Sequence, residues 1–377
     1  MKSGPGILIV AGELSGDAHA ARVLRSLREE LPDLQAWGYG GDHLAEEGME
    51  ILEHIRDLSV MGFWEVLKRY GYFKRCFEDL RKEIQRRKPD LILLVDYPGF
   101  NLRLADAVKG WGIPVIQYVC PQVWAWKQKR IPKMAETLDA VVCIFPFEPA
   151  VFSDVDLQVF YAGHPMVEET AGVTADPGWT AAVKLALVPG SRLQEIDRIF
   201  LPMLEAAARI VKMIPDLQIR VPAADALCGK RIRELCLSRP DLPAVEVVSG
   251  KMRELVKGAD AALVTSGTAT LETALLGTPM LIVYKTSWLT YEIGRRVIKV
   301  PFIGMVNLVA EREVCPEFIQ DEARPDEMSE ALLPLMTDTP ERQKMLAGLA
   351  EVRQRLIPDE GGKTVSRFLM QYLQEAE

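Results

Sequence analysis

Short apolar runs alternate with amphipathic segments along the whole chain, and this alternation constrains the fold more than any other feature. It predicts parallel sheets whose two faces are both covered by helices. The strands expected in the first half are 6–11, 35–39, 91–95, 114–118 and 140–145. Those expected in the second half are 185–188, 218–221, 244–247, 261–264 and 280–284. Clear helices are expected at 17–31, 73–88 and 200–213.

The length of 377 residues indicates two domains rather than one. The segment 168–180 is polar, contains Gly and Pro and lacks periodicity, so it predicts a linker. We therefore expect an α/β protein with two doubly wound Rossmann-like domains, 1–167 and 168–360, which face each other across a cleft. In such folds ligands bind at the carboxyl ends of the strands.

Composition excludes several classes of function. The net charge of −8 argues against a nucleic-acid binder, which needs an excess of Lys and Arg. No apolar run approaches the length of a membrane span, and the run 6–10 is typical of a strand rather than of a signal-peptide core. The six cysteines lack CxxC spacing, and because no export signal is recognised we expect reduced, buried thiols in the cytoplasm. The four histidines lack the spacing of metal ligands, so we expect no metal site.

The segment 261–280 indicates a nucleotide site. Its apolar run breaks at Thr-Ser-Gly-Thr, where a helix is expected to begin with Ser266 or Thr268 as its N-cap. The loop, which contains Gly267, would present free backbone N–H groups and a helix N-terminus to a phosphate. Glu272 lies one turn further on the face of Thr268, where a carboxylate would accept both hydroxyls of a ribose. The alternative is an ordinary strand–loop–helix joint with a solvent-facing Glu272.

Two further loops follow expected strands. The loop from Gly12 to Asp17 lacks the GxGxxG spacing of a dinucleotide site, which disfavours an NAD enzyme. The loop 189–192 reads Pro-Gly-Ser-Arg, and its Arg192 has the forked donors that suit a phosphate or a carboxylate. An ordinary surface turn is an equally weighted alternative for this second loop.

Ordered motifs across both halves of the chain resemble one family. They include Ala-Gly-Glu-Leu-Ser-Gly-Asp at 11–17, Asp-Tyr-Pro-Gly-Phe-Asn at 96–101 and Ser-Gly-Thr-Ala-Thr-Leu-Glu at 266–272. The others lie at 60–67, 122–130, 145–148, 163–165, 187–192 and 306–310. From end to end the chain resembles the lipid A disaccharide synthases, which are glycosyltransferases of the two-domain GT-B architecture.

This resemblance implies a reaction. UDP-2,3-diacylglucosamine would donate its sugar to the 6-hydroxyl of 2,3-diacylglucosamine 1-phosphate, giving the β-linked lipid A disaccharide and UDP. Inversion needs a base for the acceptor hydroxyl and stabilisation of the departing diphosphate, and we assign these roles to Asp96 and Arg192. Gly99 stands where many members carry a second acid, which favours Asp96. His19 is a rival base, and His164 is more consistent with a structural role.

The resemblance also implies the substrate-binding set and the partners. The set is Glu13, Ser15, Gly16, Ser191, Ser266, Gly267, Thr268, Glu272 and Asn307. No metal and no cofactor is expected, because a helix N-terminus and Arg192 supply positive potential. Family members form homodimers with exchanged C-terminal segments. The C-terminal helix expected within 361–377 would therefore pack on the N-terminal domain or on a partner subunit.

Two basic, aromatic segments suit the surface of an anionic membrane. Residues 61–90 carry nine Lys or Arg against five Asp or Glu, and 124–133 carry tryptophans and cations without an acid. The expected membrane and acyl-chain contacts are Trp64, Lys68, Arg69, Phe73, Lys74, Trp124, Trp126 and Lys127. The alternative is aromatic packing on the core beneath a solvated charged face. Because the implied substrates are lipids, we expect a cytoplasmic enzyme peripherally attached to the inner membrane.

Two other functions stay open. The chain could be a different UDP-sugar enzyme of the same architecture, such as the lipid-linked peptidoglycan transferase or a UDP-sugar epimerase, although these lack the Gln-Val-Trp-Ala-Trp run at 122–126. It could instead be a nucleotide-sensing module that binds UDP without turnover. Release of UDP from an acylated donor would separate the enzyme from the module.

Overall fold

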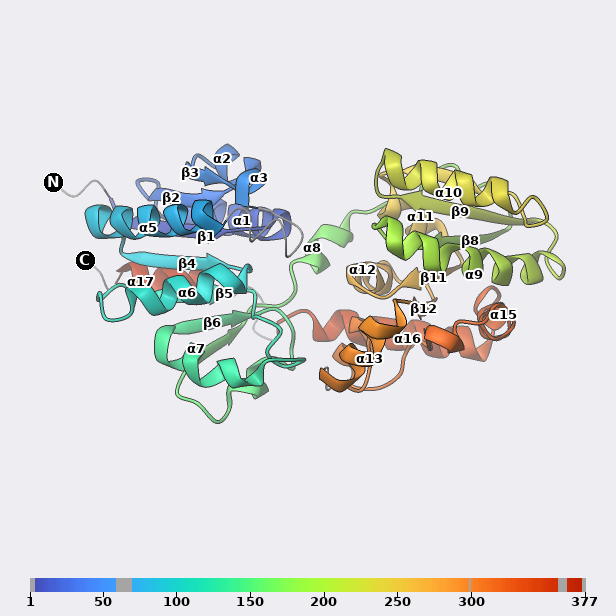
Figure 1. The fold of residues 1–377 in the computed structure, drawn as a ribbon. Helices are drawn as coiled ribbons and strands as arrows, with labels where there is room; N and C mark the ends of the chain where they lie inside the picture. Colours follow the sequence, from blue (N-terminus) through green and yellow to red (C-terminus); the bar gives the residue numbers. More distant parts are fainter. Residues whose placement is uncertain (1–3, 59–69, 298–299, 359–364, 375–377) are drawn as a thin grey trace. The chain divides into compact units, whose positions relative to one another are not determined.

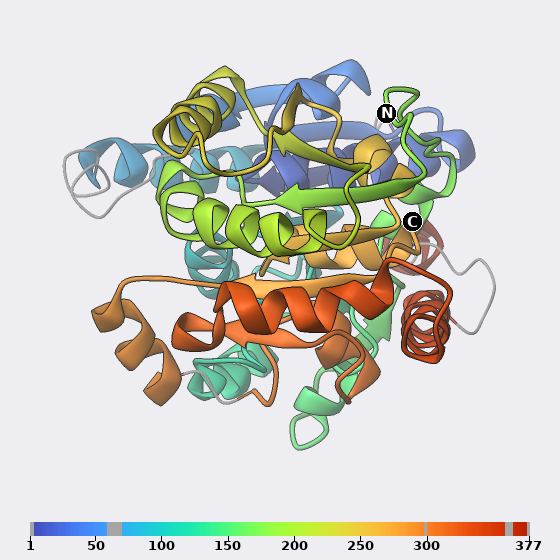
Figure 2. The same cartoon turned by 90° about the vertical axis from the view of Figure 1, so that its right-hand side faces the viewer.

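The computed structural model describes residues 4–58, 70–297, 300–358 and 365–374. The chain divides into two compact units, the first comprising Met1–His164 with Pro358–Glu377 and the second Pro165–Ile357. Figure 1 and Figure 2 show that each unit is a sheet flanked by helices. Within the described ranges, every helix is too short or too polar to span a bilayer.

The first unit is built on a seven-stranded sheet with the order β3-β2-β1-β4-β5-β6-β7. Its strands are β1 (Gly6–Ala11), β2 (Gln35–Gly40), β3 (Glu50–His54), β4 (Leu91–Val95), β5 (Val115–Tyr118), β6 (Ala140–Cys143) and β7 (Gln158–Tyr161). All neighbouring strands are parallel. The central strand β4 reads Leu-Ile-Leu-Leu-Val and is buried throughout, as a parallel strand covered on both faces should be.

Helices cover both faces of this sheet. They are α1 (Leu14–Glu30), α2 (Asp42–Glu46), α3 (Ile55–Leu58), α5 (Tyr70–Arg87), α6 (Pro98–Val108), α7 (Ile131–Thr137) and α17 (Val365–Gln374), with short 3₁₀ turns at Gln128–Arg130 and Pro149–Phe152. One hydrophobic cluster includes α1 and α17, and the other includes α5, α6 and α7. Phe368 of α17 stacks on Phe160 of β7 with ring centroids 4.8 Å apart. The C-terminal helix therefore contributes to the core of the first unit (Figure 1).

The second unit contains a six-stranded parallel sheet with the order β10-β9-β8-β11-β12-β13. Its strands are β8 (Val183–Val188), β9 (Leu217–Ala223), β10 (Glu246–Ser249), β11 (Ala261–Thr265), β12 (Met280–Tyr284) and β13 (Glu317–Ile319). Its helices are α8 (Met166–Ala171), α9 (Leu193–Val211), α10 (Ala226–Ser238), α11 (Met252–Gly258), α12 (Thr268–Leu275), α13 (Trp288–Val297), α14 (Met305–Ala310), α15 (Pro325–Leu332) and α16 (Pro340–Arg355), with short 3₁₀ turns at Gln320–Glu322 and Leu333–Leu335. Helix α9 packs against α10 and α15, whereas α12 packs against α11, α14 and α16. The prediction of two parallel-sheet α/β domains is confirmed.

The segment 168–180 is not the free linker that its composition predicts. Helix α8 covers its first part. Asp176 is buried and accepts a hydrogen bond of 2.8 Å from Arg220 Nη1 on β9. The Arg220 guanidinium also lies over the ring of Trp179, 5.1 Å from its centroid. These long-range contacts fix the segment on the second unit, and a local reading of composition does not reveal them.

Both sheets change strand order at one position. In the first sheet, β2 and β3 lie on one side of β1 and β4 lies on the other, and Ala11 pairs with Val95 at the ends of β1 and β4. In the second sheet, β9 and β10 lie on one side of β8 and β11 lies on the other, and Val188 pairs with Val264. Ligands of open parallel sheets bind outside the carboxyl ends of the strands at such switch points. The two switch points therefore mark the loops after β1 and β4 and those after β8 and β11 as candidate ligand-binding loops.

Candidate active site

The loop after β11 has the open geometry of an anion site. Helix α12 begins at Thr268, and the residue before it, Gly267, has φ = 143°, which favours glycine. A Cβ at Gly267 would meet no atom within 4 Å, so the space above the loop is open. No side chain caps this helix, which leaves its first N–H groups directed at that space.

The expected N-cap of α12 is wrong. Gly267 holds the N-cap position instead of Ser266 or Thr268. The Ser266 hydroxyl donates to the carbonyl of Ile303 at 3.1 Å, so it ties the loop to the segment before α14. This correction makes the helix N-terminus more accessible than the sequence indicates, because no hydroxyl occupies it.

Glu272 lies one turn into α12 and is held by an arginine. Arg253 Nε on α11 donates to Glu272 Oε1 at 2.7 Å, and Arg253 Nη2 donates to Glu169 Oε2 on α8 at 2.8 Å. The Glu272 side chain is only 14% exposed. Burial raises the pKa of Glu272, and the ion pair with Arg253 offsets part of that shift. Neither Glu169 nor Arg253 was expected at the site, because they lie 103 and 19 residues before Glu272 in the sequence.

The loop after β8 lies beside the loop after β11 in the sheet. Its Ser191 and Arg192 N–H groups donate to Glu195 Oε2 at 3.2 and 3.3 Å, and Arg192 Nη1 donates to Glu195 Oε1 at 2.8 Å. Glu195 thus forms a capping box at the start of α9, which begins at Leu193 rather than in the expected 200–213. The Arg192 side chain is 72% exposed, so its charge is accessible to a ligand.

Asn307 of α14 is fully buried, and its amide is saturated within the protein. Its Oδ1 accepts from the N–H groups of Val314 and Cys315 at 2.8 and 3.0 Å. Its Nδ2 donates to the Cys315 carbonyl at 2.8 Å and to Glu317 Oε1 at 2.9 Å. Glu317 in turn accepts from the N–H groups of Ile303 and Gly304. Asn307 therefore organises the segment that holds Ser266, and in this state it has no hydrogen bond left for a ligand.

Asp96 directly follows β4 at the switch point of the first sheet. Asp96 and Tyr97 have φ values of 49° and 46°, a left-handed conformation that costs about 1–2 kcal/mol for a residue with a side chain. Two buried amides stabilise this turn, because Asn101 Nδ2 and Gln117 Nε2 donate to the Asp96 carbonyl at 2.7 and 3.1 Å. Burial raises the pKa of the Asp96 carboxyl, which suits a general base.

The glycine loop after β1 is adjacent to Asp96. A Cβ at Gly16 would lie 3.6 Å from the Cβ of Asp96, so the first turn of α1 rests on this residue. Glu13 is the N-cap of α1. Burial first, and then the Asp96 charge, raises the pKa of the Glu13 carboxyl. Ser15 is exposed in the same turn. The structure therefore brings Glu13, Ser15, Gly16 and Asp96 together.

The two histidines considered as site residues, His19 and His164, occupy different surroundings. His19 Nδ1 lies 2.7 Å from Arg22 Nη2, and its ring lies 6.4 Å from that of Tyr118 at the end of β5. His164 is buried and packs against Phe145 with ring centroids 4.9 Å apart. This packing fits the structural role expected for His164.

The expected membrane contacts differ in exposure. Trp64, Lys68 and Arg69 lie outside the described residues. Phe73 packs on the core, and Trp124 donates from Nε1 to Glu148 Oε1 at 3.2 Å, so both have partners inside the protein. The exposed members are Lys74, Trp126 and Lys127. Lys127 Nζ lies 3.7 Å above the ring of Trp126.

Three buried groups that the sequence does not connect lie next to this region. The ligand atoms of Cys120, Cys143 and Glu148 lie within 4.8 Å of one another. Glu148 accepts from Trp124 and from the N–H groups of Ile144 and Phe145, both at 3.0 Å. Burial raises the pKa of Glu148 to about 7. These hydrogen bonds use the Glu148 carboxylate to close the loop after β6, which gives this residue a structural role.

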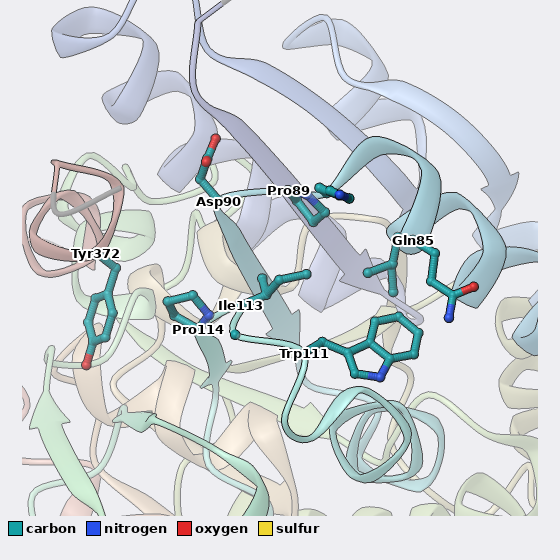
Figure 3. Close-up of a pocket in the computed structure, with 10 residues that line it drawn as sticks. Gln85, Pro89, Asp90, Trp111, Ile113, Pro114 and Tyr372 are labelled. Atoms are coloured by element: carbon teal, nitrogen blue, oxygen red, sulfur yellow. The ribbon is translucent and has the colours of Figure 1, made fainter. Parts of the chain in front are cut away.

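A pocket of about 730 Å³ lies near the amino ends of the strands of the first sheet (Figure 3). Asp90 and Pro114, which precede β4 and β5, contribute to its lining with Trp111 and Tyr372. Because it adjoins the amino ends of the strands, it is separate from the carboxyl-end loops that carry Glu13 and Asp96.

Solved structures share this fold at low sequence identity. A structure described as the glycosyltransferase of kitacinnamycin aligns with a TM-score of 0.63 and 15% identity, covering 99% of this chain and 100% of that one. A putative UDP-N-acetylglucosamine 2-epimerase from Listeria monocytogenes aligns with a TM-score of 0.61 and 13% identity, covering 92% and 91%. The fold is therefore that of the GT-B glycosyltransferases and related epimerases.

Sequence relatives give the family. Residues 7–363 match the family described as lipid-A-disaccharide synthetase. The lipid-A-disaccharide synthase of Myxococcus xanthus is 40% identical over 368 residues, 94% of each chain. That of Anaeromyxobacter dehalogenans is 41% identical over 356 residues, 93% of each chain. The chain belongs to the lipid-A-disaccharide synthase family, and it is a glycosyltransferase of lipid A biosynthesis.

Proposed function

We propose that this enzyme transfers the diacylglucosaminyl group of UDP-2,3-diacylglucosamine to the 6-hydroxyl of 2,3-diacylglucosamine 1-phosphate, with inversion, giving a β-1′,6 disaccharide 1-phosphate and UDP. The observation that carries this proposal is the position of the family motifs. The motifs that contain Asp96 and Glu13 flank one switch point, and those that contain Arg192 and Glu272 flank the other. A base and a nucleotide site are what an inverting transfer requires.

In the second unit, we assign donor binding to the loops after β8 and β11. The open N-terminus of α12 and the exposed Arg192 would bind the diphosphate, and the charge that develops on the departing UDP would be stabilised there. Glu272 would accept the ribose hydroxyls through its carboxylate. Asn307 would act indirectly, by holding the segment that anchors Ser266.

In the first unit, we assign the general base to Asp96. In a single displacement, Asp96 takes the proton of the acceptor 6-hydroxyl while the oxygen attacks the anomeric carbon and the bond to UDP breaks. Burial raises the pKa of the Asp96 carboxyl, and a higher pKa makes the carboxylate a stronger base. Glu13 would bind the acceptor sugar. Burial, and then the charge of the neighbouring Asp96, raise the pKa of the Glu13 carboxyl, which is consistent with a position beside the base.

We also propose that the enzyme is cytoplasmic and attaches to the inner membrane peripherally. Supporting this are the exposed Trp126 and Lys127, whose ring and cation lie in contact, and the exposed Lys74. Exposed aromatic rings and cations suit an anionic lipid surface. Homodimer formation by exchange of C-terminal segments is a related proposal. In this chain α17 contacts α1. In the exchanged dimer, α17 of each copy would instead contact α1 of the other copy.

Release of UDP tests the proposed reaction. Purified protein should release UDP only when the acylated donor and the acylated acceptor are both present. UDP-N-acetylglucosamine without acyl chains should give neither transfer nor epimerisation. UDP release that is independent of the acceptor would contradict the proposed transfer.

A further inference from the structure

We propose that Arg253 is a positioning residue that fixes the Glu272 carboxylate for the ribose hydroxyls and so sets the preference of the site for ribonucleotides over deoxyribonucleotides. This inference rests on the proposed function, in which Glu272 contacts the ribose of the donor. It adds a residue and a specificity that neither the motifs nor the family assignment supplies.

The contacts of Arg253 place it between two carboxylates from different helices. Its Nε bonds Glu272 Oε1 of α12 at 2.7 Å, and its Nη2 bonds Glu169 Oε2 of α8 at 2.8 Å. In the part of the chain that is described, Glu272 Oε2 has no hydrogen-bond partner. One oxygen of Glu272 is therefore fixed by the protein, and the other is left for a ligand.

The planarity of the guanidinium makes this arrangement directional. A fork whose donors are held at both ends by carboxylates cannot rotate without losing a bond, so it sets the orientation of Glu272. The side chains of Arg253, Glu169 and Glu272 are 32%, 24% and 14% exposed, which means that water screens these bonds only in part.

Removing the guanidinium would take away the positive charge that Glu169 and Glu272 share. Like charges in partly buried surroundings repel and favour protonation of one carboxyl or its rotation away. Either change removes an acceptor from the ribose hydroxyls, because a protonated carboxyl keeps less acceptor capacity than a carboxylate. The effect would fall on hydroxyl recognition rather than on the diphosphate, which binds elsewhere on the loops.

The test compares affinities for UDP, 2′-deoxy-UDP and 3′-deoxy-UDP by isothermal titration calorimetry. In the wild type, loss of one hydroxyl should weaken binding about ten- to a hundredfold, as for a hydrogen bond to a charged group. Arg253→Gln should weaken the affinity for UDP by a similar factor. Its affinities for the two deoxy analogues should stay within about threefold of the wild-type values, so that the ratio of UDP affinity to deoxy-analogue affinity falls towards one. Arg253→Lys keeps the charge without the fork and should lie between the two.

Arg239→Gln is the matched control. Arg239 also bridges two carboxylates, Glu205 and Asp241, and its side chain is 35% exposed. Arg239 directly follows α10 and lies near the amino ends of the strands, away from the carboxyl-end loops of the proposed donor site. This variant should keep the wild-type preference for UDP, whereas a loss of preference here would show that any broken ion pair has the same effect.

Glu272→Gln separates failure of this inference from failure of the proposed function. If Glu272→Gln loses the hydroxyl preference and Arg253→Gln keeps it, the role of Arg253 is refuted while the ribose contact stands. If the wild type shows no preference, the ribose contact itself is refuted. Should Arg253→Gln fail to fold in a thermal melt, Arg253→Lys and Glu169→Gln carry the test, and a wild-type preference in both would overturn the inference.

Discussion

Replacing Asp96 by Asn removes the proposed base with little change of shape. Asn adopts the left-handed conformation about as readily as Asp, so the φ of 49° at this position is retained. The bonds from Asn101 and Gln117 go to the Asp96 carbonyl and are not affected by the substitution. The melting temperature should therefore stay within a few degrees of the wild type.

The expected loss is in turnover. General-base catalysis contributes about 10²–10⁴-fold, so kcat of Asp96→Asn should fall by that factor. Affinity for UDP should be unchanged, because the donor loops belong to the second unit. The assay is UDP release with both acylated substrates, with UDP binding measured separately by calorimetry.

The pH profile gives a second, independent readout. Burial raises the pKa of Asp96 above its ordinary value of 3.8. As the pH falls, the carboxylate gains a proton and can no longer act as a base, so kcat/KM of the wild type should decline towards acid pH. Because the pKa is raised, this decline should begin at a higher pH than for a carboxyl with the ordinary pKa. Asp96→Asn should lack this decline. If the variant keeps more than about a third of the wild-type rate, its loss is far smaller than that expected for a missing base, and the assignment of Asp96 is refuted. Glu13 or His19 would then be the next candidates for the base.

The remaining predictions concern phosphate binding, packing and the membrane. Arg192→Ala should weaken UDP about ten- to a hundredfold by calorimetry, and unchanged affinity would remove Arg192 from the donor site. Gly12→Ala should destabilise the protein by about 1–3 kcal/mol in urea unfolding, because its new Cβ would overlap the ring of Tyr97; unaltered stability would mean that the ring moves freely. The double variant Lys74→Glu, Lys127→Glu should bind anionic vesicles at least about thirtyfold more weakly than the wild type in a sedimentation assay, with neutral vesicles as the control. Equal binding by both proteins would mean that these residues are solvated and do not contact the membrane.

The central strands could be predicted from the sequence, and three edge strands could not. Strands such as β4 and β11 are buried on both faces, so they appear as continuous apolar runs. In contrast, β3, β7 and β13 lie at the edges of their sheets, are short and are only partly buried. Each of these strands is only three to five residues long and includes polar residues, so it shows no continuous apolar run in the sequence.

The candidate site was predictable where its signal is local. The loops that carry Asp96, Arg192 and Gly267 directly follow apolar strands, and the switch points of parallel sheets then locate them. Arg253 was not predictable, because it meets Glu169 from a position 84 residues away. Asn307 shows the opposite limit, since its position in a motif does not reveal that all its hydrogen bonds are made inside the protein.

The most direct test of the proposed reaction is the structure of its product. Purified enzyme would be incubated with UDP-2,3-diacylglucosamine and 2,3-diacylglucosamine 1-phosphate, and the product analysed by mass spectrometry and by NMR of the new anomeric centre. We expect a disaccharide 1-phosphate with a β-1′,6 linkage, formed in equal amount with UDP. Absence of a disaccharide, or an α linkage at the new bond, would contradict the inverting transfer proposed for this enzyme.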